Sequence, residues 1–169
     1  FDGSGLSGIN GVLDIASRMV AMYPCGGMTL YEYQPVVSAY YDGVTFCHKQ
    51  LISANEPWSG YYSFDSGFEM AQHFAQFFKK GWRFVDGACH SDGEKGGDGH
   101  ALIHTVYNYM TAMDPVTGDY STMMVNATDQ VIVYDVVISG LAKASQSVHL
   151  WEMRGHDGGS YDENYFRKV

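Results

Sequence analysis

The spacing of apolar residues changes near residue 81, and this change constrains the fold more than any other feature of the sequence. Before it, helical and extended segments alternate. Apolar residues recur at helical spacing over 12–22 and 66–79, while β-branched and aromatic runs at 29–34 and 51–54 indicate two short strands. Alternating helices and strands are typical of an α/β layer or barrel, so we expect these two strands to run parallel.

The second part has the period-two pattern of strands, separated by glycine-rich turns. The segments that show this pattern are 82–88, 101–107, 120–126, 131–138 and 147–153. Such a series is typical of an antiparallel β-sandwich. We therefore expect an α/β domain over 1–81 and an all-β domain over 82–169.

Neither domain is expected to be complete. Two helices and two strands in about 80 residues are too few for a closed parallel barrel, which takes about 250 residues. The sequence also opens with Phe1 rather than with a Met and a basic, apolar signal segment. We expect the 169 residues to be part of a longer protein.

Composition excludes several classes of partner. The 10 Lys and Arg against 19 Asp and Glu give a net charge of −9, which provides no attraction for nucleic acid or anionic lipid. No stretch approaches the roughly 20 apolar residues of a membrane helix. We expect neither a nucleic-acid partner nor a membrane span.

The segment Asn55-Glu56-Pro57-Trp58 is the sharpest local motif, because it places a carboxylate directly after a short apolar strand. Barrels of parallel strands collect their active-site groups at this position. Asn-Glu-Pro at a strand end resembles the general-acid motif of many retaining glycosidases, and Trp58 offers a platform for a sugar ring. The alternative is a Glu56 that caps a turn beside a core Trp.

Two other groups of residues have weaker patterns. A set of acidic residues and histidines comprises His90, Asp92, Glu94, Asp98, His100 and His104. Its glycine spacing favours a solvated turn, and its ligand spacing matches neither a zinc nor a calcium motif, so we expect no metal. No phosphate-binding or dinucleotide-binding motif is present either, and we expect no cofactor.

The sequon Asn126-Ala127-Thr128 fits N-glycosylation and favours a secretory route. The three cysteines are Cys25, Cys47 and Cys89. An odd count leaves at least one thiol unpaired within the chain.

A longer pattern resembles a known family. The residues that carry it are Glu56-Pro57-Trp58-Ser59-Gly60-x-Tyr62, Ala71-x-His73, Gln76-Phe77 and Gly81-Trp82, with Met28-Thr29 and Tyr40-Tyr41 upstream at compatible spacing. This pattern resembles the strand-eight segment and the following helix of glycoside hydrolase family 59, the galactosylceramidase family. Weaker counterparts occur at Glu94-Lys95-Gly96-Gly97 and at Leu150-Trp151.

The resemblance implies a retaining β-galactosidase with a catalytic TIM (β/α)8 barrel, a β-sandwich and a lectin-like domain. This chain would hold the end of the barrel and most of the sandwich. Glu56 would follow barrel strand eight and line the site without being the acid. The family's acid would lie before Phe1, and its nucleophile at or just before the first residue, so no catalytic residue is assigned here.

The sequence departs from the family at two positions. Gln34 stands where the family has a substrate-contacting Trp, and the Arg of the sandwich that reaches the sugar has no counterpart near Val131. The loss of a stacking ring and a charged clamp would change substrate choice or abolish binding.

We expect part of a secreted, lysosomal or cell-surface glycoside hydrolase that acts on β-galactosides or related glycoconjugates, glycolipids included. Its partners would be the carbohydrate or glycolipid substrate and the segments or chains that complete the barrel. Glu56, Trp58 and Gln34 are the expected substrate-binding residues, and Asn126 is the expected glycosylation site. The alternative is a non-catalytic module derived from a glycosidase, within an extracellular or cell-surface assembly.

Overall fold

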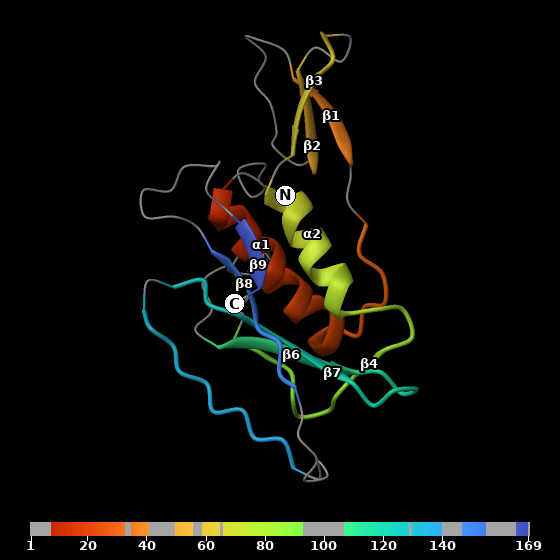
Figure 1. The fold of residues 1–169 in the computed structure, drawn as a ribbon, viewed down its shortest axis with the longest axis vertical. Helices are drawn as coiled ribbons and strands as arrows, with labels where there is room; N and C mark the ends of the chain where they lie inside the picture. Colours follow the sequence, from red (N-terminus) through yellow and green to blue (C-terminus); the bar gives the residue numbers. More distant parts are fainter. Residues whose placement is uncertain are drawn as a thin grey trace.

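The computed structural model describes residues 8–32, 35–40, 50–55, 59–64, 66–92, 107–128, 130–139, 147–154 and 165–168. Two helices lie between a small three-stranded sheet and a four-stranded antiparallel sheet, and a two-stranded hairpin runs beside them (Figure 1). The described residues form a mixed α/β fold.

Helix α1 spans Gly8–Val20 and continues as a π-helical segment, η2, over Ala21–Cys25. The helix expected over 12–22 is confirmed, although it is longer at both ends. The chain leaves η2 through Gly27, whose φ of +67° is strained for other residues. The Met28 N–H then donates to the Met22 carbonyl at 3.0 Å, which closes the end of the helix.

Helix α2 spans Ser66–Phe77 and confirms the helix expected over 66–79. Before it lies the three-stranded sheet, built from β1 (Val37–Tyr40), β2 (Ile52–Asn55) and β3 (Tyr61–Phe64) in the order β1-β2-β3. β1 and β2 are parallel, whereas β3 pairs with β2 in the antiparallel direction. β3 was not predicted.

The strand expected over 29–34 is wrong. The described residues 28–32 form no strand, and the strand that pairs with β2 begins after Pro35, at Val37. Proline has no N–H to give to a neighbouring strand, so the ladder starts beyond it. The Val36 carbonyl is its first acceptor, since it receives the N–H groups of Leu51 and Ile52 at 3.1 and 2.9 Å.

The four-stranded sheet lies beyond residue 81 and is antiparallel throughout, as predicted. Its strands are β4 (Arg83–Phe84), β5 (His90–Ser91), β6 (Asn108–Met113) and β7 (Tyr120–Val125). β6 is central and pairs with the other three. The strand expected over 120–126 is therefore confirmed, whereas that expected over 101–107 falls outside the described residues except for Tyr107, and β6 follows it.

Of two further expected strands, one is absent and the other is shorter than expected. The segment 131–138 forms no strand, and its Val131 is 93% exposed. Period-two alternation alone does not make a strand, because the backbone also needs a partner to complete its hydrogen bonds. The strand expected over 147–153 is shorter, since β8 covers Trp151–Arg154 and pairs with β9 (Tyr165–Lys168).

One hydrophobic core joins the helices to the four-stranded sheet. Its buried members from the helical part are Val12, Ile15, Ala16, Met19, Val20, Met70 and Phe78, and those from the sheet are Met110, Ala112, Met123 and Val125. Residues on both sides of position 81 therefore share this core. The domain boundary, the barrel and the sandwich stay predictions.

No helix among the described ranges is long and apolar enough to cross a membrane.

Glu69 and His73 are partly buried titratable residues one turn apart on α2. The next turn carries Phe77, whose ring meets Trp151 of β8 at 5.9 Å between centroids. Burial raises the pKa of the Glu69 carboxyl above its ordinary value of 4.5 and lowers the pKa of His73 below 6.5. Glu69 Oε2 has no hydrogen-bond partner to offset this burial in the structure.

Replacing Met110 with Ala should lower the free energy of unfolding by roughly 2–5 kcal/mol, because this fully buried side chain would leave a cavity in the core. Met124→Ala is the matched control, since Met124 lies on the neighbouring strand and is 41% exposed. Urea denaturation of both variants measures the difference. Equal losses would show that Met110 is not at the centre of the core.

Glu69→Gln should stabilise the protein at neutral pH and have little effect below pH 4.5. The raised pKa means that the folded state holds this proton more tightly than the unfolded state, so the wild-type protein loses stability as the pH rises through the folded pKa. Urea midpoints at several pH values test this, with exposed Glu32→Gln as the control. A gain that is the same at every pH would contradict the role of burial.

Candidate functional site

The candidate site begins where the parallel strands β1 and β2 end. Tyr40 lies opposite Asn55 in the register of these strands, so both carboxyl ends meet at one edge of the sheet. Parallel strands of α/β folds deliver active-site loops to this edge. The connection from β2 to β3 leaves from Asn55, and it contains Glu56 and Trp58, which lie outside the described residues. Their roles as cleft-lining residues stay predictions.

The return of this connection into β3 is fixed by Ser59 and Gly60. The Tyr61 N–H donates to Ser59 Oγ at 3.2 Å, and Gly60 adopts a φ of +79°. Glycine reaches this left-handed conformation at no steric cost. Because Asn55 and Tyr61 are opposite each other in the register, the six-residue motif from Asn55 to Gly60 ends beside its own start.

Two tyrosines of β3 follow this turn and present large rings to solvent. Tyr61 is 63% exposed and Tyr62 is 61% exposed. The Tyr62 ring meets Phe64 edge-on at 5.9 Å, and Phe64 lies 4.6 Å from Phe68 of α2. Exposed, supported rings of this kind can stack against the apolar face of a sugar. Tyr62 was expected only as part of the family pattern, and Tyr61 was not among the expected site residues. Two aromatic residues directly after a Ser-Gly turn could have indicated an exposed binding surface.

Gln34 also lies outside the described residues, so only the elements near it in the sequence can be placed. Gln34 precedes β1 in the chain, and Tyr40 is the residue that β1 carries to the edge shared with Asn55. The amino end of β2 is anchored separately by Gln50, which is fully buried and donates from Nε2 to Ser53 Oγ at 2.7 Å. Whether Gln34 contacts substrate stays a prediction.

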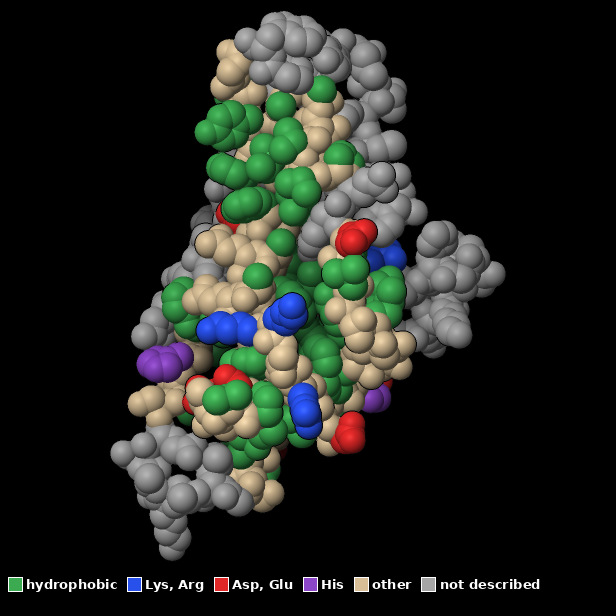
Figure 2. All heavy atoms as spheres, turned by 90° about the vertical axis from the view of Figure 1, so that its right-hand side faces the viewer, with side chains coloured by type: hydrophobic (Ala, Val, Ile, Leu, Met, Phe, Trp, Pro, Cys, Tyr) green, Lys and Arg blue, Asp and Glu red, His purple; other side chains and the backbone are tan. Residues whose placement is uncertain are grey.

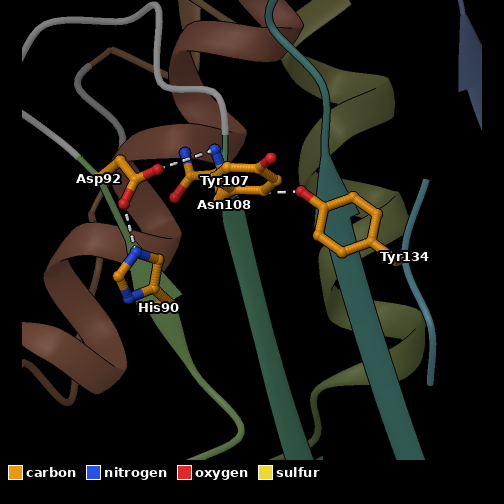
Figure 3. A network of polar contacts seen from close by, with 5 residues as sticks. All are labelled: His90, Asp92, Tyr107, Asn108 and Tyr134. Atoms are coloured by element: carbon orange, nitrogen blue, oxygen red, sulfur yellow. Dashed lines mark hydrogen bonds and ion pairs between the residues drawn. The ribbon is translucent and has the colours of Figure 1, made fainter. Parts of the chain in front are cut away.

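A network of polar contacts between five residues lies on the four-stranded sheet (Figure 3). Asp92 Oδ1 pairs with His90 Nε2, and Asp92 Oδ2 accepts the Tyr107 N–H at 3.2 Å. The Asn108 N–H donates to Tyr134 Oη at 3.4 Å, and the Tyr134 ring meets that of Tyr109 edge-on at 5.9 Å. These contacts join β5 and β6 to the segment 130–139.

The side chain of Asn108 is fully buried, and neither its Nδ2 nor its Oδ1 has a hydrogen-bond partner in the structure. A buried amide without partners costs free energy, so this position constrains the packing of β6. His90 and Asp92 are the described members of the acidic and histidine-rich set, and the other four fall outside the described residues. Within the described ranges, no three metal-ligating side chains come together.

Asn126 is exposed, as expected for a glycosylation site at the end of β7. Its Oδ1 accepts the Thr128 N–H at 3.0 Å and the Thr128 hydroxyl at 2.7 Å, so the two polar residues of the sequon are already joined. Nδ2 donates to the Gln130 carbonyl at 2.8 Å. An amide nitrogen has two hydrogens, which leaves one that a glycan can replace without breaking this bond.

Comparison with known proteins gives the site its context. The model of Glycosyl hydrolase family 59 matches residues 3–76. Galactocerebrosidase of Mus musculus is 26% identical over 135 residues, which cover 76% of this chain and 19% of that protein. That of Salmo salar is 26% identical over 138 residues, with coverages of 78% and 20%. That of Danio rerio is 36% identical over 63 residues, with coverages of 37% and 10%.

No solved structure matches the chain. The chain spans about a fifth of the length of the first two relatives, at 19% and 20%. The matched segment contains α1, the parallel strands and the turn with the exposed tyrosines. The predicted resemblance to glycosyl hydrolase family 59 is therefore confirmed over residues 3–76.

Proposed function

We propose that this chain is part of a retaining glycoside hydrolase that acts on β-galactosides or related glycoconjugates, including glycolipids. The observation that carries the proposal is the family match over residues 3–76, which covers the strand ends of the candidate site. The relatives named galactocerebrosidase support a galactose-containing substrate. No described feature favours a non-catalytic module.

The parallel pair of strands fits the terminal unit of a (β/α)8 barrel. In such a barrel β1 and β2 would be strands seven and eight, so strand six from the rest of the protein would pair with β1, at the edge of the sheet. Strand one would have to take the place beside β2 that β3 holds among the described residues. Hydrophobic side chains gather over this sheet (Figure 2). Val36, just before β1, and Val37, its first residue, are about half exposed. A strand placed beside β1 would cover them.

In this proposal, the chain supplies the wall of the substrate cleft. A retaining mechanism needs two carboxyl groups about 5 Å apart, and neither is assigned to these residues. Glu56 and Trp58 would line the cleft beside the end of β2, Tyr62 would stack on the substrate, and Gln34 would contact it from the segment before β1. Rings of this kind hold a sugar at modest energetic gain, while the polar groups fix its orientation.

A secretory or lysosomal location fits the exposed sequon and the relatives. Glycosidases of the secretory route carry N-glycans on exposed Asn-x-Thr sites. The hydrogen-bonded turn at Asn126 and Thr128 is compatible with such a glycan.

The complete protein should hydrolyse an aryl β-galactoside and leave the α-anomer intact, with galactose released first in the β configuration. NMR of the initial product distinguishes retention from inversion. Release of the α-anomer first would overturn the retaining mechanism, and turnover of neither substrate would overturn galactosidase activity.

Within that assay, Tyr62→Ala should lower kcat/KM by about tenfold, the value of one lost stacking contact of about 1.4 kcal/mol. Tyr120→Ala is the matched control, because Tyr120 is 47% exposed on β7 in the other sheet. Glu56→Gln should also reduce turnover while leaving the unfolding transition unchanged. Equal effects at Tyr62 and Tyr120 would remove Tyr62 from the site.

Asn126→Gln should reduce the mass of the secreted protein by one N-glycan. Thr128→Ala should do the same, since the sequon needs its hydroxyl residue. Intact-mass measurement before and after enzymatic deglycosylation tests both variants. A wild-type protein whose mass is unaffected by deglycosylation would show that the site is unused.

A further inference from the structure

Two cysteines that are far apart in the sequence are carried by neighbouring elements. Cys25 is the last residue of η2, and Cys89 directly precedes β5. η2 and β5 are in contact, so the segments that contain the two cysteines are neighbours in the fold. Both cysteines are free thiols in this structure.

The two thiols differ in their surroundings. Cys25 is exposed, whereas Cys89 is partly buried beneath the edge of β6. The Thr111 N–H donates to Cys89 Sγ at 3.4 Å, and the thiol lies 3.5 and 3.6 Å from the carbonyls of Thr111 and Val85. These contacts hold the sulfur of Cys89 in place, and the side chain packs against the hydrophobic core.

Their electrostatic behaviour agrees with this proximity. Burial raises the pKa of the Cys89 thiol, and the nearby Cys25 raises that pKa further because two thiolates repel each other. The exposed Cys25 is then the thiol that meets a reagent in solution first.

We propose that Cys25 and Cys89 form a disulfide when the protein is oxidised, and that this bond ties η2 to the four-stranded sheet. The inference goes beyond the proposed hydrolase function and stands independently of it. The bond would join residues that are 89 − 25 = 64 positions apart and so cross the expected domain boundary near residue 81. Closing a long loop restricts the unfolded chain, which is how such bonds stabilise proteins.

The oxidant is a small-molecule disulfide such as oxidised glutathione. The Cys25 thiolate attacks it, forms a mixed disulfide and releases one reduced glutathione. The Cys89 thiolate then attacks the Cys25 sulfur, forms the protein disulfide and releases the second. Two protein thiols are oxidised, the glutathione disulfide is reduced, and the two thiol protons end on the two glutathione molecules.

The test is peptide mapping of the complete protein after equilibration with oxidised glutathione, with free thiols blocked by iodoacetamide before digestion without reductant. We expect one linked pair of peptides containing Cys25 and Cys89, with Cys47 alkylated, and separation of the pair on reduction. A map in which Cys25 and Cys89 are both alkylated, or in which either is linked to Cys47, would overturn the proposal.

Serine variants give a second readout. Oxidation should raise the melting temperature of the wild-type protein and of Cys47→Ser alike, and Cys25→Ser should lose this rise. Because Cys25 is exposed, its variant should fold normally, whereas partly buried Cys89 is a less suitable site for a variant. An oxidation-dependent rise that persists in Cys25→Ser would also overturn the proposal.

Discussion

The burial of α1 is the interaction on which the rest of the structure depends. Its apolar face, formed by Val12, Ile15 and Met19 with their neighbours, packs against α2 and the four-stranded sheet. Each fully buried side chain of this size contributes about 1.5–3 kcal/mol through the hydrophobic effect. The sheet needs this cover, because buried positions alternate along β6 and a sheet with one apolar face must pack against another layer.

Helix α1 also carries a largely buried ion pair between Asp14 and Arg18. Arg18 Nε lies 2.6 Å from Asp14 Oδ1 one turn earlier, and both side chains are largely buried. Tyr31 lies in the segment that leads to β1, and burial raises the pKa of its hydroxyl while the charge of Arg18 opposes that rise. A buried ion pair of this kind fixes geometry more than it adds stability. Tyr31 also packs against the core, so the segment that follows η2 lies against the helical layer.

Apolar side chains of the core are buried, whereas several of those on the three-stranded sheet are exposed to solvent. The core buries its methionines and valines completely, whereas β1 and β3 leave Val37, Tyr61 and Tyr62 exposed. Exposed apolar surface that is continuous over a sheet marks a place of contact with another surface or with a ligand. The family match spans the buried helix α1 and the exposed strands of the small sheet. One segment of sequence therefore supplies both part of the core and the exposed apolar surface.

The sequence by itself determined the elements that depend on near neighbours, and it determined the family that the chain resembles. Both helices, the strand at 51–54, the turn between β6 and β7, and the antiparallel character after residue 81 follow from spacing and turn residues within a few positions. The resemblance to glycosyl hydrolase family 59 follows from a sequence motif, and the family model matches residues 3–76.

Tertiary structure decided what depends on distant partners. The ladder of β1 starts at Val37 rather than before Pro35, since it is the pairing with β2 that fixes its position. The alternating segment 131–138 stays without a strand, because a backbone finds its hydrogen-bond partners only where the chain folds back on itself. Asn108 is buried because tertiary packing covers its position on β6, although its side chain gains no hydrogen bond there. The contact between η2 and β5 likewise brings the segments of Cys25 and Cys89 together across 64 positions, a separation that a local pattern cannot encode.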